Sequence, residues 1–227
     1  MIPSIKTILR TIALMAAAAA ATVTVRANSY YSVFVDTSEL VGSLAGPFSL
    51  DFQLNDGSGW GDGNNTAALS NFKFGGGSAV SGATTSGGAS GDLISGITIT
   101  DSNSTLNEFY QGFLPGNWLS FNLSLSTNLD LDGTPDLFSF AILDGNLMNL
   151  ATQSFGSDNF LEINIDSLTP SVATFASADG LINAHVPDTF NTGIYSAVLL
   201  VALVVLKRRR SGEGAALRTD LAVSRVA

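Results

Sequence analysis

The chain has 227 residues, of which 45% are hydrophobic and only 13% are charged, and its formal net charge is −9. This composition excludes the disordered, collagen-like and coiled-coil classes, and the length suits one all-β domain or two small domains. Residues 28–188 carry a net charge of −16, with Lys73 as their only Lys or Arg, so they repel phosphate and exclude nucleic acid as a partner.

Residues 1–27 have the layout of a secretory signal peptide. Lys6 and Arg10 precede an apolar run with six consecutive alanines, and Val25 and Ala27 fit the small-x-small cleavage pattern. We expect cleavage after Ala27, with a site inside the alanine run as the second choice. The alternative is an uncleaved membrane anchor, for which the run is short.

Residues 28–185 are predicted to form a β-rich extracellular domain. Apolar and polar residues alternate strictly over 48–54 and 119–126, as in strands with one solvated face. Weaker alternation brings the number of expected short strands to about eight, the others lying over 31–35, 72–74, 97–100, 138–142, 161–165 and 172–175.

The strands are separated by clusters of Asn, Asp, Gly and Ser that favour turns, and no helical period of useful length intervenes. Many short strands without crossover helices predict an all-β fold, an antiparallel β-sandwich or jelly-roll-like domain. The expected flanking elements are an N-terminal signal helix and a C-terminal hydrophobic helix.

The segment 75–91 contains seven Gly and little besides Ser, Ala and Thr. Such residues bury too little apolar area to offset the entropy cost of ordering them, so we expect a long flexible loop within one domain. A linker between two subdomains is the alternative.

Catalytic chemistry has few candidates in this sequence. The chain has no Cys, and its single His, His185, stands beside the C-terminal motif and is expected to be an exposed linker residue. A pair of carboxylates such as Glu108 and Glu162 could hydrolyse glycosides only if the fold brought them together. We expect no catalytic residues and no enzyme activity.

Aromatic side chains could instead stack on sugar rings where they are exposed. The candidates are Trp60, Tyr110, Phe113 and Trp118, and core packing is the alternative for each. Trp118 is out of phase with the apolar residues that follow it, which indicates an outward side chain.

One loop resembles the Asp-rich calcium loops of extracellular proteins. Asp130, Asp132 and Asp136 flank a Gly turn, and carboxylates at such spacing can converge on Ca²⁺. The loop lacks the later bidentate Glu, and an ordinary hairpin turn is the favoured interpretation. Ca²⁺ is the only cofactor that the sequence suggests.

The C-terminal region combines a short motif, an apolar run and a basic cluster. Val186, Pro187, Asp188 and Thr189 precede an apolar run over 194–206 that is only marginally long enough to span a membrane. A basic stop follows directly and favours the cytoplasmic side, which places 28–185 outside. Its residues are Lys207, Arg208, Arg209 and Arg210.

This arrangement resembles the C-terminal sorting signal of PEP-CTERM proteins, in its VPD-type variant, over residues 186–210. The resemblance implies a bacterial protein processed by an exosortase-type membrane enzyme. Unlike most members of that class, the chain continues beyond the basic cluster, over 211–227, as a cytoplasmic tail. An ordinary single-pass anchor is the alternative.

The sequence therefore predicts a non-catalytic exported protein that is anchored in the membrane during sorting and then resides at the cell surface or in the extracellular matrix. Association with exopolysaccharide in a biofilm is the setting that the resemblance implies. The competing hypothesis is a carbohydrate-binding module or carbohydrate-active enzyme, for which exposed aromatic residues near paired acids would be the distinguishing feature.

Overall fold

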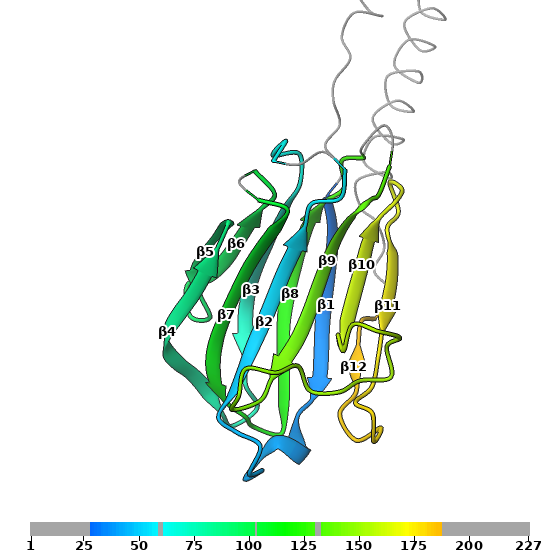
Figure 1. Ribbon diagram of the computed structural model, residues 1–227. Helices are drawn as coiled ribbons and strands as arrows, with labels where there is room; N and C mark the ends of the chain where they lie inside the picture. Colours follow the sequence, from blue (N-terminus) through cyan, green and yellow to red (C-terminus); the bar gives the residue numbers. More distant parts are fainter. Residues whose placement is uncertain (1–27, 59–60, 103, 130–132, 188–227) are drawn as a thin grey trace, which may run out of the picture.

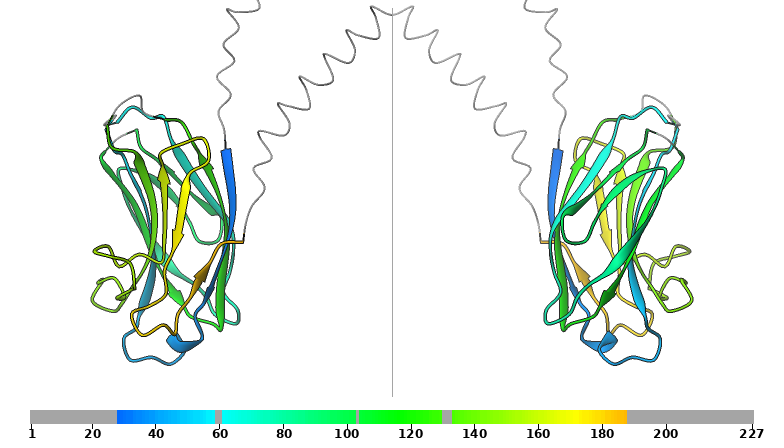
Figure 2. Two further views of the ribbon diagram at one scale, coloured as in Figure 1. Left: turned by 90° about the vertical axis from the view of Figure 1, so that its right-hand side faces the viewer. Right: turned by 90° about the vertical axis from the view of Figure 1, so that its left-hand side faces the viewer.

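The computed structural model describes residues 28–58, 61–102, 104–129 and 133–187, and these form two six-stranded sheets. The sheets pack face to face as two layers (Figures 1 and 2), and every pairing recorded between the strands is antiparallel. The predicted antiparallel β-sandwich is confirmed. The expected N-terminal and C-terminal helices lie outside the described residues.

Sheet A contains, from edge to edge, β12 (Ala184–His185), β1 (Asn28–Asp36), β8 (Trp118–Ser126), β3 (Thr66–Lys73), β6 (Gly96–Thr100) and β5 (Gly88–Asp92). Sheet B contains β11 (Ser171–Thr174), β10 (Leu161–Ile165), β9 (Asp136–Leu143), β2 (Phe48–Asn55), β7 (Leu106–Leu114) and β4 (Ser78–Ser86). A single turn of 3₁₀-helix, η1 (Ser38–Leu40), follows β1.

The core lies between the sheets and is rich in aromatic rings. Alternation along β2 and β8 sends their apolar residues inward, as the sequence predicted. Phe52 is fully buried and packs edge-on against Phe121 of sheet A at 5.2 Å between ring centroids. It also stacks on Phe140 of the neighbouring strand at 5.1 Å. These rings join the two layers.

Strand β7 was missed because half of its inward-facing side chains are polar. Asn107 and Gln111 are buried, and they alternate with the core residues Phe109 and Phe113. The Asn107 amide nitrogen donates to the Leu54 carbonyl oxygen at 3.1 Å, and its oxygen accepts from the backbone N–H of Gly88 at 2.8 Å. The Gln111 side chain likewise accepts from the backbone N–H of Leu93 and donates to the Val80 carbonyl oxygen, so both polar side chains satisfy backbone groups.

The prediction of a long loop over 75–91 is wrong, and so is the alternative of a linker. The segment forms β4, an edge strand of sheet B paired with β7, and β5, an edge strand of sheet A paired with β6. Backbone hydrogen bonds hold these edge strands, so small side chains suffice. Gly87 lies between them with a positive φ of 62°, where an added Cβ would lie 2.4 Å from the Asn107 amide oxygen.

Candidate functional site

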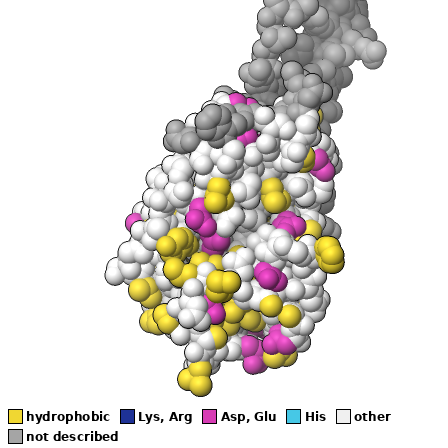
Figure 3. Space-filling view, in the orientation of Figure 1, with side chains coloured by type: hydrophobic (Ala, Val, Ile, Leu, Met, Phe, Trp, Pro, Cys, Tyr) yellow, Lys and Arg dark blue, Asp and Glu magenta, His cyan; other side chains and the backbone are white. Residues whose placement is uncertain are grey.

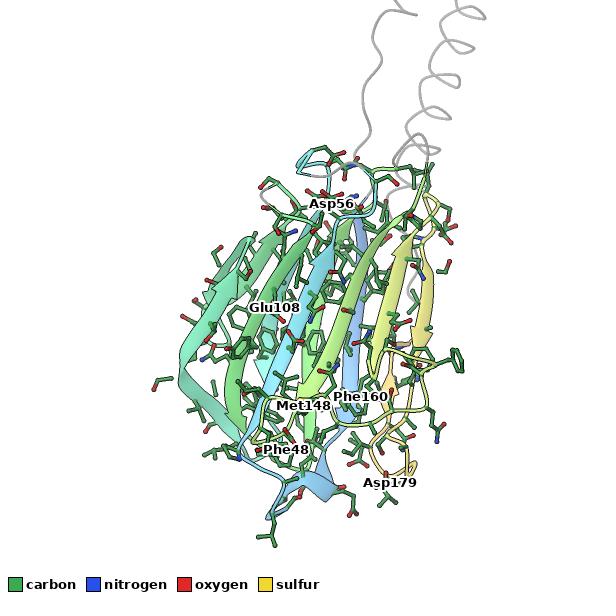
Figure 4. All side chains as sticks on the ribbon, in the orientation of Figure 1. Phe48, Asp56, Glu108, Met148, Phe160 and Asp179 are labelled. Atoms are coloured by element: carbon green, nitrogen blue, oxygen red, sulfur yellow. The ribbon has the colours of Figure 1, made fainter. Side chains whose placement is uncertain are left out.

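One end of the sandwich gathers four carboxyl side chains from three connections between strands. Asp56 follows β2, Asp62 precedes β3, Asp101 follows β6, and Asp136 begins β9. Figure 4 shows Asp56 at this end, where the loops meet. We call these four residues the acidic end. Lys73 lies at the far end of β3, about 20 Å away at the usual rise of a strand.

A buried asparagine organises the acidic end. Asn65 has no exposed surface, and its side-chain nitrogen donates to Asp136 Oδ2 at 2.7 Å and to the Asn128 carbonyl oxygen at 2.9 Å. Its backbone N–H donates to Asp101 Oδ2 at 2.8 Å. Asn65 therefore ties together two carboxylates that are 35 residues apart in the chain.

Asp101 is the least compensated of these acids. It has no exposed surface, and its Oδ1 has no hydrogen-bond partner. Burial raises the pKa of this carboxyl to about 7, and the nearby charges of Asp136 and Asp62 act in the same direction. Neither Asp101 nor Asn65 was predicted from the sequence, although the run of Asp, Gly and Asn over 56–65 was a signal in this region.

The predicted calcium loop is described only at Asp136, because Asp130 and Asp132 lie outside the described residues. Asp136 is buried, and its Oδ1 accepts a 2.8 Å hydrogen bond from the backbone N–H of Gly57. Its Oδ2 accepts from Asn65. Within the described ranges, no three carboxyl, imidazole or thiol groups converge as metal ligands.

A second carboxyl pair lies on the outer face of sheet B. The Gln53 amide nitrogen donates to Asp51 Oδ2 at 2.8 Å and to Glu108 Oε1 at 3.1 Å, so one amide bridges the two acids. Asp51 is only 3% exposed, and its Oδ1 has no partner. Burial, followed by repulsion from Glu108, raises the pKa of Asp51 to about 7.

The two candidate acids Glu108 and Glu162 do not form a pair. Glu108 lies on β7 (Figure 4) and Glu162 on β10, with β2 and β9 between these strands. Glu162 instead accepts a 2.9 Å hydrogen bond from the Asn159 side chain. Two intervening strands place the acids about 14 Å apart, too far for either geometry of glycoside hydrolysis.

The outer face of sheet A has a different chemistry. Phe34 and Trp118 stack at 5.9 Å between ring centroids with 22° between their planes, and Phe34 is 43% exposed. The outward position predicted for Trp118 is confirmed. Tyr30, on the same face of β1, is also exposed. These three residues form the aromatic strip.

Hydroxyl and amide groups cover the rest of this face. Ser32 donates to Asn122 across β1 and β8 at 3.2 Å, and further outward positions are Ser120, Ser124, Ser70, Thr98 and Ser90. The acids within the strands of sheet A are Asp36 and Asp92, each the last residue of its strand. In contrast, acidic and hydrophobic side chains are interspersed on the face of sheet B (Figure 3).

The other aromatic candidates and His185 lie at separate places in the fold. Phe113 is a core residue at 2% exposure, and Tyr110 is partly exposed on sheet B, between Asp51 and Thr84. His185 is exposed as expected, but it lies in strand β12. Trp60 lies outside the described residues.

The C-terminal motif is described only in its first half. Val186 packs partly against the core, and Pro187 is exposed. Asp188, Thr189 and the basic cluster over 207–210 lie outside the described residues. The part of the chain that the structure describes contains no helix long and apolar enough to cross a membrane.

No protein-family model matches this chain, and neither a curated protein nor a solved structure matches it. What the protein does has to follow from its own residues.

Proposed function

We propose that the sandwich is the exported, non-catalytic part of a surface or matrix protein that is sorted through its C-terminal signal. An exosortase-type enzyme in the membrane is the proposed processing partner. We further propose that the outer face of sheet A binds a neutral exopolysaccharide. The aromatic strip is the observation that carries the binding proposal.

The C-terminal limit of the described fold supports sorting. Strand β12 ends at His185, directly before the motif. Of the motif residues that the structure describes, Val186 is partly buried against the core and Pro187 is exposed, so Pro187 is the one that a processing enzyme can reach. The described strands thus end where the proposed sorting signal begins.

The chemistry of sheet A supports a neutral sugar polymer. Sugar rings present apolar C–H faces that stack on aromatic side chains and hydroxyls that exchange hydrogen bonds with Ser, Thr and Asn. Phe34 and Trp118 supply the stacking surface, and Ser32 and Asn122 supply hydrogen-bonding groups. The net charge of the domain opposes acidic polysaccharides. The separation of Glu108 from Glu162 favours binding over hydrolysis.

Processing is tested by mass spectrometry of the protein isolated from the cell surface. We expect an N-terminal peptide that starts at Asn28 and a C-terminal peptide that ends within 186–189, because the proposed enzymes cut at those sites. The unprocessed chain from a strain that lacks the sorting enzyme is the control. A surface peptide that extends through Leu206 would contradict sorting and support a permanent anchor.

Binding is tested by affinity electrophoresis in gels that contain neutral bacterial glucans or mannans, with alginate as the acidic comparison. We expect a neutral polymer to retard the protein and Trp118→Ala to weaken that retardation about tenfold, the effect of losing about 1.4 kcal/mol of ring stacking. Phe155→Ala is the matched control because this ring is fully exposed and lies outside the sheets. Unretarded wild-type protein, or equal weakening by Phe155→Ala, would refute the binding face.

A further inference from the structure

Three of the four carboxyl groups at the acidic end are buried without a nearby Lys or Arg from residues 28–187. Asp101 is 0%, Asp136 2% and Asp56 7% exposed. Lys73 is the only Lys or Arg between residues 28 and 187, and it lies at the opposite end of β3. Buried carboxylates of like charge are costly unless hydrogen bonds, protons or cations compensate them.

Hydrogen bonds account for part of this charge. Both oxygens of Asp136 are occupied by donors, and so is Asp101 Oδ2. Asp101 Oδ1 remains, fully buried and without a partner, and Asn65 links this carboxyl to that of Asp136. A cation bound at Asp101 Oδ1 would give this oxygen a partner and would also neutralise part of the negative charge around it.

We propose that the acidic end binds one divalent cation of the calcium type, with Asp101 Oδ1 as a ligand. Asn65 and Asp136 act as positioning residues: Asp136 orients Asn65, whose backbone holds the other oxygen of Asp101. Because the described acids do not form a group of three carboxylate ligands, the other ligands are neutral oxygens and water, which calcium accepts.

This site differs from the calcium loop that the sequence suggested. There, Asp136 was to bind the ion directly, whereas its oxygens are used by Gly57 and Asn65. The ligand is instead Asp101, from the connection after β6. The proposal is independent of sorting and of polysaccharide binding, since neither involves the acidic end.

A bound cation and a bound proton both remove the charge of Asp101, but they predict different responses. A cation stabilises the folded protein in proportion to the logarithm of its concentration once the concentration exceeds Kd. If a proton neutralises Asp101 instead, the stability of the folded protein does not depend on the calcium concentration. The matched control is Asp51→Asn, because Asp51 is an equally buried acid with an unpartnered Oδ1 that lies outside the acidic end.

The experiment follows the thermal unfolding of the full-length protein in mild detergent at pH 7.5, first with chelator and then with increasing CaCl₂. We expect calcium to raise Tm by several degrees in the wild type and in Asp51→Asn, and to leave the Tm of Asp101→Asn unchanged. Calorimetric titration with CaCl₂ should give about one ion per wild-type chain and none for Asp101→Asn.

Asp62→Asn provides a second variant that preserves the fold, because Asp62 is exposed and its contacts are local hydrogen bonds to Asn64. We expect it to weaken calcium binding several-fold by removing a neighbouring negative charge. The proposal is overturned if millimolar calcium leaves the wild-type Tm unchanged. It is equally overturned if Asp101→Asn, or Asp62→Asn where Asp101→Asn does not fold, retains the full wild-type response.

Discussion

Replacing Phe52 with alanine is expected to lower the free energy of unfolding by about 3–5 kcal/mol, the cost of removing a fully buried aromatic ring. Phe52 has no exposed surface, and its ring contacts phenylalanines from both sheets. These are Phe72 and Phe121 of sheet A and Phe109 and Phe140 of sheet B, at centroid distances of 5.1–6.4 Å. The neighbouring rings are fixed in four strands and cannot collapse into the cavity.

Urea denaturation of the full-length protein in detergent measures this effect as a fall in the midpoint at constant slope. Phe155→Ala removes the same ring from a fully exposed position and should change stability by less than about 0.5 kcal/mol. A loss below about 1 kcal/mol for Phe52→Ala would mean that the rings do not join the two layers as described.

Replacing Asp51 with asparagine is expected to have the opposite effect and to stabilise the protein at pH 8 by about 2–3 kcal/mol. The pKa of Asp51 is about 7 in the folded protein and 3.8 by its ordinary value, so the folded state binds more protons between these two pH values. Stability therefore falls as pH rises from about 4 to about 7 and stays low above that. Asparagine carries no charge to desolvate and can still accept the Gln53 hydrogen bond.

The full difference of about 3 pKa units corresponds to about 4 kcal/mol, from which the cost of one buried amide without a partner is subtracted. Denaturation of both proteins at pH 4 and pH 8 measures the change, which at pH 4 should be a loss of about 1–2 kcal/mol because only the cost of the amide remains there. Glu39→Gln, an exposed acid in η1, is the control and should change little at either pH. A gain for Asp51→Asn that is independent of pH would contradict the assigned burial of the charge.

These two neighbouring residues show how far local sequence determines a strand. The alternation over 48–54 was sufficient to predict that Phe52 faces the core and Asp51 faces outward. The same alternation led us to expect that the outward side chains are exposed to solvent. This expectation is wrong for Asp51, which is buried. Strand β2 lies inside sheet B between β7 and β9, with Tyr110 and Ala141 opposite Asp51, so this outward position is buried as well.

Similar limits apply to the elements that were missed. Asn107 and Gln111 interrupt the apolar pattern of β7, and they are buried because they bind backbone groups of neighbouring segments. Strand β4 has almost no buried side chains, because its pairing with β7 depends on backbone groups. Neither strand carries the hydrophobic period by which strands are recognised in a sequence.

The sequence by itself determined the all-β class, the inward faces of the regular strands and the division of charge between an acidic middle and basic ends, because these properties depend on composition and on local period. Only the tertiary structure decided which polar groups lose water and which distant groups meet. Asp101 lies beside Asp136, and Glu108 beside Asp51 and far from Glu162, because strand order and register place them there. Strand order and register are set by packing between segments far apart in the chain, and no local sequence pattern contains that information.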